Sequence, residues 1–407
     1  MHSQGSNATI LLIIFITTKS LPNYNRIDLN FIHGNGAWLY TKNAKYLDFS
    51  SGIAVNCLGH ANKKLIKALQ SQANKLWHTS NLFRISEQEK LAKKLCDNSF
   101  ADKAFFCNSG AEATEGIVKM VRRYHFAMGE KKRRNIIVLN NAFHGRTVTG
   151  IQAGYNQTHR EGFLGKENCD CGFSRLSMNK IDILEKKINS STAAILFEPI
   201  QGEGGINTFS RDFFVKVKKL CKKHKILLAF DEVQSGIART GKLFSHEWYG
   251  VSPDIMGLAK GLGGGFPVGA VLMTNKVARG MVAGTHGSTF GGNQLACSVA
   301  LAVINEVSKK SFLSKVYAKG LYLKKKLEKI KKDFPDKIIS IKGKGLLLGI
   351  ELRNPPNSFC DLARKKKLLL VPAANNVIRL LPPLNIKKDE IKIALEIIEK
   401  CFREINE

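Results

Sequence analysis

The middle of the chain is built from short apolar runs separated by stretches with helical spacing. From about Ala101 onward these runs are AFFCNS (104–109), NIIVLN (135–140), AAILFEP (193–199), ILLAFDE (226–232), DIMGLA (254–259) and GAVLMT (269–274). They lack the polar alternation of a half-exposed strand, so each is typical of a strand that is buried on both faces. Strands of this kind form mostly parallel sheets with helices on both faces. The sequence therefore predicts an α/β fold.

The two ends of the chain have a different pattern. Residues 36–52, GAWLYTKNAKYLDFSSG, are typical of a β-hairpin. After Asn293 the sequence predicts long helices, the second of them basic and amphipathic to about Lys332, then short strands and a final helix from Lys388. We therefore expect a smaller α+β domain that is made from both chain ends.

These patterns predict the domain organisation. Residues 61–300 should form the large domain, and residues 21–60 together with 301–407 should form the small one. Residues 1–20 contain the apolar stretch Ala8–Thr18, which is too short to span a bilayer and lacks the basic region and cleavage site of a secretory signal. We expect an N-terminal extension without an assigned role, and no membrane association.

The chain is strongly basic, with 63 Lys and Arg against 33 Asp and Glu among 407 residues and a formal net charge of +30. Such a charge suits a nucleic-acid-binding protein, a membrane-surface protein or an enzyme of anionic substrates. Much of the excess lies in the helical patterns 62–75 and 319–332, and no known basic-aromatic nucleic-acid module is found. We interpret the charge as a solvated surface and expect no nucleic-acid partner.

The cysteines indicate a reducing compartment. Nine cysteines at irregular positions, an odd number, favour free thiols over a disulfide framework, and so a cytoplasmic protein. The CDC stretch at Cys169–Cys171 has no second pair at the spacing of zinc ligands. No metal is therefore expected.

Between Ile255 and Asn275 the only charged side chain is Lys260, which stands before a glycine-rich turn. A lysine among apolar and glycine residues loses hydration, which lowers its pKa and favours the neutral, nucleophilic amine. The glycines would let the backbone approach a ligand closely. The alternative is a lysine that falls at the end of a strand by chance.

Polar candidates follow each of the predicted strands, at the edge where ligands bind in such sheets. They are Ser109-Gly110-Ala111, Phe143-His144-Gly145-Arg146, Glu198 with Gly202-Glu203-Gly204-Gly205, Asp231-Glu232-Val233-Gln234, and Lys260. A lysine, an aspartate, an arginine, an aromatic ring and a glycine-containing helix start are the groups that pyridoxal phosphate chemistry requires.

Each of these candidates also has a plain structural interpretation. Asp231 at a buried strand end needs a cation, such as a protonated pyridine nitrogen, or it caps the next helix. Ser109 and the two residues after it could bind a phosphate at a helix N-terminus, or form an ordinary N-cap. Phe143 could stack on a flat ring and Arg146 could bind a carboxylate, or they are a core phenylalanine and a surface arginine.

In this order the motifs resemble those of the class III aminotransferases of pyridoxal phosphate fold type I, most closely the acetylornithine aminotransferase branch. The resemblance extends from about Pro22 to the C-terminus. It is carried by YLDFSSGIAVNCLGH, FCNSGAEATEGIVKMVRRY, NAFHGRT, EPIQGEGGI, DEVQSGIARTGKLF, PDIMGLAKGLGGGFPVGA, GTHGSTFGGN and VIRLLPPL. It implies a large domain with a mostly parallel sheet, and a smaller domain built from both termini.

The resemblance implies a role for several residues around pyridoxal 5'-phosphate. Lys260 should bond to the cofactor and then move protons as the acid–base group. Asp231 should pair with the pyridinium nitrogen, and Gln234 should bond the phenolic oxygen. Phe143 and Val233 should lie on opposite faces of the ring.

The resemblance also implies a homodimer with shared active sites. Ser109, Gly110 and Ala111 should hold the cofactor phosphate, and Thr289 should reach the same phosphate from the other subunit. The active unit would then be at least a dimer.

Five residues are implied in substrate binding. Arg146 should bind a carboxylate, and Ser288 and Tyr24 should lie near the substrate. Glu203 should neutralise Arg379 when an ω-amino donor binds, and release it to bind the α-carboxylate of glutamate.

The implied reaction is a ping-pong transfer from N2-acetylornithine to 2-oxoglutarate, which gives N-acetylglutamate 5-semialdehyde and glutamate in arginine biosynthesis. Ornithine, succinyldiaminopimelate and 4-aminobutyrate aminotransferases share most of these residues and remain alternatives.

Overall fold

The computed structural model describes residues 19–164, 172–177 and 181–405. The apolar stretch Ala8–Thr18 and the Cys169–Cys171 stretch lie outside these residues. Among the helices that are described, none is long and apolar enough to cross a membrane.

The largest sheet within the described residues has seven strands in the order β4-β12-β11-β10-β7-β5-β6. Its strands are β4 (Lys103–Cys107), β5 (Asn135–Leu139), β6 (Phe173–Leu176), β7 (Thr192–Phe197), β10 (Leu227–Asp231), β11 (Ile255–Leu258) and β12 (Gly269–Met273). Strand β12 runs antiparallel to both of its neighbours, and the other pairings are parallel. The predicted mostly parallel sheet is therefore confirmed.

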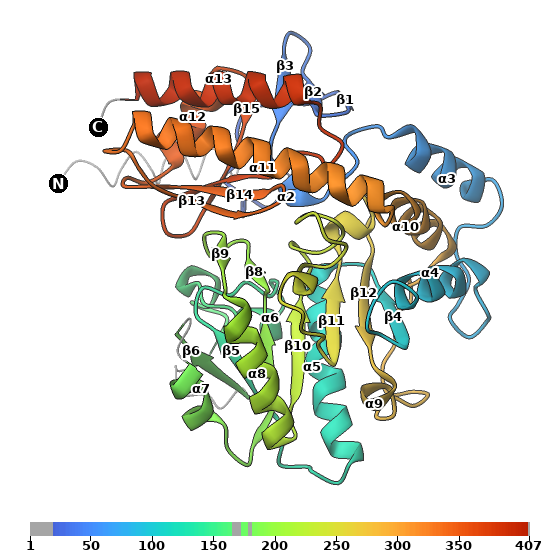
Figure 1. Ribbon diagram of the computed structural model, residues 1–407. Coiled ribbons are helices and arrows are strands. Elements are labelled where there is room, and N and C mark those ends of the chain that lie inside the picture. The colour runs from blue at the N-terminus through green and yellow to red at the C-terminus, as the bar shows by residue number, and fades with distance from the viewer. Residues whose placement is uncertain (1–18, 165–171, 178–180, 406–407) are drawn as a thin grey trace.

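Helices cover both faces of this sheet, as the apolar runs predicted. Helix α5 (Gly110–Ala127) packs with alternate strand residues such as Ile136 and Leu227, while α8 (Arg211–His224) packs with Ile137 and Leu228 on the other face. Figure 1 shows α8 in front of the sheet and α5 behind it. Further helices of this lobe are α3 (Lys63–Ala73), α4 (Ser86–Cys96), α6 (Val148–Ala153), α7 (Ile181–Lys187), α9 (Asn275–Ala278) and α10 (Gln294–Val307).

The N-terminal and C-terminal parts of the described chain lie together in the other lobe, at the top of Figure 1. The predicted N-terminal hairpin is present as β2 (Trp38–Tyr40) and β3 (Lys45–Asp48), and β3 pairs in parallel with β15 (Leu368–Leu369) from the C-terminal part. The remaining elements are β1 (His33–Asn35), β13 (Ile338–Lys344), β14 (Leu347–Leu352), β16 (Val371–Ala373), β17 (Val377–Leu380), α11 (Lys310–Asp333), α12 (Asn357–Lys365) and α13 (Lys388–Glu404). The domain boundaries given above stay a prediction.

A short segment after β3 has an unusual backbone. In α2 (Ser51–Ala54) the φ angles of the four residues are 47°, 63°, 61° and 64°, so the turn is left-handed. A left-handed conformation costs roughly 1–2 kcal/mol for each residue other than glycine. Only Gly52 avoids this cost, so other contacts must stabilise the turn.

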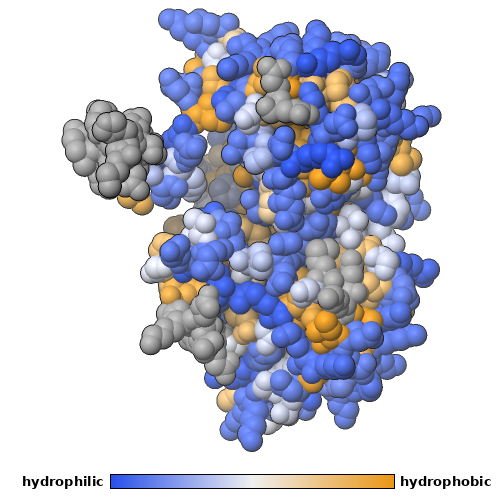
Figure 2. Space-filling model, turned by 90° about the vertical axis from the view of Figure 1, so that its left-hand side faces the viewer, coloured by the Kyte–Doolittle hydropathy of each residue, from blue (hydrophilic) through white to orange (hydrophobic). Residues whose placement is uncertain are grey.

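Basic residues of the described helices lie at the surface. Hydrophilic residues cover most of the face shown in Figure 2. On α11 the lysines Lys315, Lys325, Lys326 and Lys329 are exposed, while Leu323 and Leu327 of the same helix are buried. The basic amphipathic pattern is thus a helix with one face in the core and its lysines in water.

Candidate active site

A cavity of about 410 Å³ lies at the carboxyl ends of the parallel strands. Its walls come from the segments that follow β4, β5, β7, β10 and β11. Twelve of the residues singled out in the sequence line it: Ser109, Gly110, Ala111, Phe143, His144, Gly145, Arg146, Glu198, Asp231, Val233, Gln234 and Lys260. The structure therefore brings together groups that are up to 151 positions apart (260 − 109) in the chain.

Lys260 begins the short helical turn η3 (Lys260–Leu262), directly after β11. Its φ of 43° lies in the left-handed region, which is uncommon for a residue with a side chain and is found most often at functional sites. Burial, together with the positive charge of Arg379, lowers the pKa of its amine to about 8. The negative charges of Asp231, Glu198 and Glu203 partly oppose this shift. The amine is thus poised to lose its proton near neutral pH.

Asp231 is the last residue of β10 and is buried. One carboxylate oxygen accepts a hydrogen bond from the Val233 amide at 3.0 Å, and the other lies 2.8 Å from Nδ1 of His144. Turns and η2 (Ser245–Trp248) follow it rather than an α-helix, so the alternative that it caps a helix is wrong. The carboxylate belongs to the cavity.

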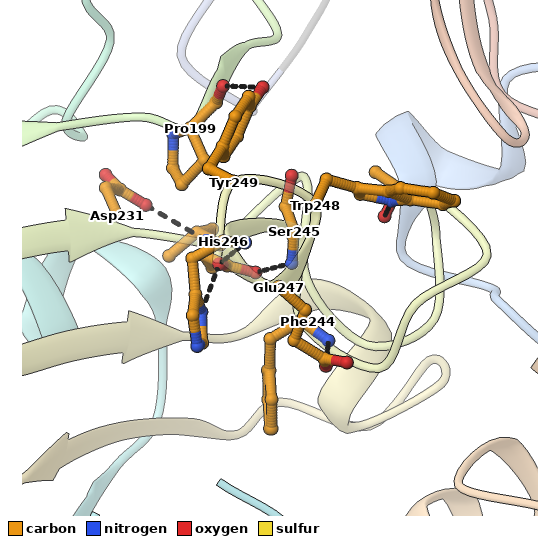
Figure 3. A network of polar contacts seen from close by, with 11 residues as sticks. Pro199, Asp231, Phe244, Ser245, His246, Glu247, Trp248 and Tyr249 are labelled. Carbon is orange, nitrogen blue, oxygen red and sulfur yellow. Dashed lines mark hydrogen bonds and ion pairs between the residues drawn. The ribbon is translucent and has the colours of Figure 1, made fainter. Parts of the chain in front are cut away.

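The next carboxylate along the strand faces away from the cavity, because successive strand residues point to opposite sides. Glu232 is fully buried and accepts hydrogen bonds from the amides of Ser245 and His246, and it contacts Nδ1 of His246 at 2.9 Å. Figure 3 shows Ser245 and His246 close together, with Asp231 to their left. Glu232 thereby fixes the strand end from which Asp231 projects.

Two buried groups of the cavity received no role from the sequence. Burial disfavours the charged form of His144, but the hydrogen bond to Asp231 and the negative charges of Asp231 and Glu198 together outweigh this and raise its pKa. Burial also raises the pKa of Glu198 to about 7, although the nearby His144 lowers it. The oxygens of Glu198 accept from the amides of Phe143 at 3.0 Å and Gly202 at 3.1 Å. Their positions after predicted strands marked both residues as candidates, but no local pattern showed what they contact.

The start of α5 has both features considered for it: an N-cap and backbone amides at the wall of the cavity. Ser109 is an ordinary N-cap, since its hydroxyl accepts from the Glu112 amide at 3.1 Å. Gly110 and Ala111 nevertheless line the cavity, and the first amides of a helix have no partner within it. A Cβ atom on Gly110 would lie 2.7 Å from Val233 Cγ1, so glycine is needed for this close approach.

Glu203 and Arg379 form an ion pair at 2.8 Å beside the cavity. Arg379 lies on β17 and is buried, while Glu203 lies between the short strands β8 (Ile200–Gln201) and β9 (Asn207–Thr208). The guanidinium also donates to Oε1 of Gln234 at 3.2 Å and to the Pro372 carbonyl at 3.1 Å. Burial lowers the pKa of Arg379, and Glu203 opposes this shift.

The remaining candidates lie farther from the centre of the site. Arg146 lines the cavity but is exposed, with its guanidinium 5.9 Å from the centre of the Phe143 ring. Tyr24 is 70% exposed and Thr289 is also exposed, and neither is among the residues that line the cavity of its own chain. Ser288 accepts from Asn108 Nδ2 at 3.2 Å and is separated from the cavity by that residue. Their roles stay predictions.

The walls of the cavity have the character of a site for an anionic, ring-bearing ligand with an electrophilic carbon. The cavity has backbone amides at the start of α5, the aromatic ring of Phe143, the buried carboxylate of Asp231 and the amine of Lys260, whose pKa is lowered. Among the described residues no group of three or more His, Cys, Asp or Glu side chains is placed to hold a metal ion.

Comparison with known proteins defines the class. The model of the family "Aminotransferase class-III" matches residues 21–402, and the chain belongs to this family. Within it, the chain is 50% identical over 373 residues to the acetylornithine aminotransferase of Mesorhizobium japonicum, which covers 91% of this chain and 93% of that protein.

Solved structures show the same fold. The ornithine aminotransferase of Toxoplasma gondii superposes with a TM-score of 0.90 at 29% identity, covering 97% of this chain and 94% of that one. The N-acetylornithine aminotransferase of Stenotrophomonas maltophilia superposes with a TM-score of 0.81 at 32% identity, covering 97% of this chain and 98% of that one. The fold predicted from the sequence is confirmed by these neighbours.

The pKa of Lys260 yields a direct prediction. In protein that has been freed of cofactor, the rate at which an aldehyde reagent labels Lys260 should rise with pH and level off above about 8, because only the neutral amine attacks. Exposed lysines elsewhere, with an ordinary pKa of about 10.4, should be labelled increasingly to much higher pH. Peptide mass spectrometry across a pH series measures both. A midpoint for Lys260 equal to that of exposed lysines would contradict the effect of burial.

Proposed function

We propose that the chain is an acetylornithine aminotransferase that works with pyridoxal 5'-phosphate. It transfers the δ-amino group of N2-acetylornithine to 2-oxoglutarate in a ping-pong reaction, giving N-acetylglutamate 5-semialdehyde and glutamate for arginine biosynthesis. The observation that carries this proposal is the arrangement of charged residues around Lys260. The chain in which they occur is 50% identical to an acetylornithine aminotransferase. The seven cysteines that are described are all free, which supports a cytoplasmic location.

The residues of the cavity fit this cofactor. The Gly110 and Ala111 amides at the start of α5 would hold the phosphate, and the small glycine keeps the space beside Val233 open. Phe143 and Val233 would lie against the ring, and Gln234 beside its phenolic oxygen. Pyridoxal phosphate, when bound, supplies an aldehyde that takes up the amino group and a ring that withdraws electrons.

The protein would supply proton transfer and charge. Nζ of Lys260 takes a proton from the substrate carbon that carries the amino group and later returns one, which requires the lowered pKa of its amine. Asp231 keeps a proton on the ring nitrogen, because its buried carboxylate needs a cation beside it. His144 fixes the orientation of Asp231 through the contact at 2.8 Å.

The Glu203–Arg379 pair explains how one cavity would accept two kinds of substrate. While the pair is closed, the positive charge of Arg379 is neutralised and the cavity suits the acetylated side of the amino donor. Glu203 is 40% exposed while Arg379 is almost fully buried, so Glu203 is the partner that has room to move away. Arg379 would then bind the α-carboxylate of glutamate or 2-oxoglutarate with its planar fork.

Ornithine aminotransferase is the second candidate, because the Toxoplasma gondii enzyme of that name has a TM-score of 0.90. Its sequence identity of 29% is far below the 50% shared with the acetylornithine relative. An α-amino cation on the donor would also lack the Glu203 carboxylate as a partner, because Glu203 is paired with Arg379. We therefore favour the acetylated donor, whose α-nitrogen is neutral.

The active unit we propose is a homodimer. Large apolar side chains are exposed along two neighbouring segments, at Leu76, Trp77, Leu82, Phe83 and Phe290. The segments are tied by Asn81, which donates to the carbonyls of Ser288 and Gly291 at 2.9 Å. An exposed apolar surface of this kind is typical of an interface. A second copy placed there would bring Thr289, which lies between these residues, toward its own cavity.

Steady-state rates on four amino donors test the assignment. With 2-oxoglutarate as acceptor, kcat/KM for N2-acetylornithine should exceed that for ornithine, succinyldiaminopimelate and 4-aminobutyrate by about tenfold or more, because the site is built for a neutral α-substituent. A higher kcat/KM for 4-aminobutyrate or ornithine would contradict the assignment and leave only the aminotransferase class.

The ion pair can be tested separately in the two half-reactions. In Glu203→Gln the charge of Arg379 is no longer neutralised, so single-turnover amino transfer from N2-acetylornithine should slow by about tenfold or more, while transfer from glutamate should change much less. Glu399→Gln removes the exposed pair with Arg403 and is the matched control, for which we expect no change in either half-reaction. Equal losses in both half-reactions of Glu203→Gln would show that the pair does not select between donors.

A further inference from the structure

The left-handed turn Ser51–Ala54 leads directly into the wall of the cavity. Val55, the next residue, is the only residue before Asn108 among the described residues that line the cavity. All four residues of the turn have φ between 47° and 64°. Ile53 is the least suited to this backbone, because a β-branched side chain clashes in the left-handed region. The position of Val55 therefore depends on contacts that keep a strained turn in place.

Those contacts converge on one carboxylate. Asp48 is 1% exposed, and its Oδ1 accepts from the Ser50 amide at 2.8 Å, the Ser50 hydroxyl and the Ser51 amide at 2.9 Å. Its Oδ2 lies 2.8 Å from Nε2 of His60, on the far side of the turn. Burial alone would raise the pKa of Asp48, but these donors lower it below the ordinary value, so the acceptor stays ionised. Asp48 thus holds the start of the turn and ties it to His60. The amides of Ala54 and Val55 donate to the carbonyls of Ser50 and Ser51, so the rest of the turn is attached to this start.

The turn is also attached to the two parts of the site that handle substrate. Cys57 donates to the carbonyl of Gly261, the neighbour of Lys260, at 3.1 Å. Ala54 packs in one apolar cluster with Ile206 and Val377, which lie near Glu203 and Arg379 in sequence. The segment therefore links the lysine to the strand and loop that carry the ion pair.

We propose that Asp48 is a positioning residue for substrate binding, which holds the left-handed turn so that Val55 and Ala54 set the shape of the cavity between Lys260 and the Glu203–Arg379 pair. This role rests on the proposed function for its substrates, but the turn itself can be observed without any turnover. Asp48 contacts neither the cavity nor the reacting groups, so it acts only through the turn.

The test compares Asp48→Ala with Asp48→Asn. Alanine removes every acceptor, whereas asparagine keeps one oxygen for the Ser50 and Ser51 amides. In Asp48→Ala the KM for N2-acetylornithine should rise about tenfold with kcat changed by no more than about twofold, and Asp48→Asn should restore a KM near that of the unchanged protein. Asp97→Asn, which loses only an exposed pair with Lys93, is the control.

A second variant separates positioning from general stability. Glycine adopts the left-handed backbone without strain, so Ile53→Gly added to Asp48→Ala should return the KM toward its original value although the carboxylate is still missing. Normal substrate binding by folded Asp48→Ala would overturn the proposal. So would an equally raised KM in the double variant, or failure of both variants to fold, since Asp48 would then support the whole fold.

Amide hydrogen exchange gives a readout that is independent of activity. In protein without cofactor, exchange across residues 51–55 should be about tenfold faster in Asp48→Ala and should return to the original rate in the double variant. Unchanged exchange would overturn the proposal even if the enzyme is active. Conversely, if the unchanged protein does not act on N2-acetylornithine, the proposed function fails while the exchange result still decides the role of Asp48.

Discussion

The cavity depends on the rule that a charge removed from water needs an opposite charge beside it. Asp231 is compensated by His144 at 2.8 Å, and Arg379 by Glu203 at 2.8 Å. Lys260 has no such close partner, and burial together with the charge of Arg379 lowers its pKa to about 8. Lys260 is thus a buried amine without close compensation, and it is the group that can react. The formal charge of +30 plays no part in this balance, because the basic residues of helices such as α11 lie on the surface.

The fold could be predicted from the sequence because its signal is local. Each buried strand is a continuous apolar run, and parallel strands place the residues after them at one edge of the sheet. Lys260, Asp231 and the helix start at Ser109 were found for this reason. The sequence could not separate an N-cap from a ligand site at Ser109, and the structure shows why: the hydroxyl caps the helix while the next two residues face the cavity.

Other parts of the site depend on contacts between distant positions, which no local pattern records. His144 meets Asp231 across 87 positions, and this contact, together with the charge of Glu198, gives the histidine its raised pKa. The Glu203–Arg379 pair came only from the resemblance to a family. The left-handed turn could not be expected at all, since Ile53 and Ala54 disfavour it. The carboxylate of Asp48 stabilises it together with backbone hydrogen bonds within the turn. The local sequence pattern thus predicts which residues reach the site. Tertiary contacts decide the ionisation of these residues and the shape of the cavity.

The most direct test of the account is the identity of the residue that carries the cofactor. The protein would be incubated with pyridoxal 5'-phosphate, reduced with borohydride, digested and analysed by mass spectrometry. The account predicts the phosphopyridoxyl mass on the peptide that contains Lys260, and no turnover in Lys260→Ala. A protein that takes up no cofactor, or carries it on a different lysine, would contradict the account.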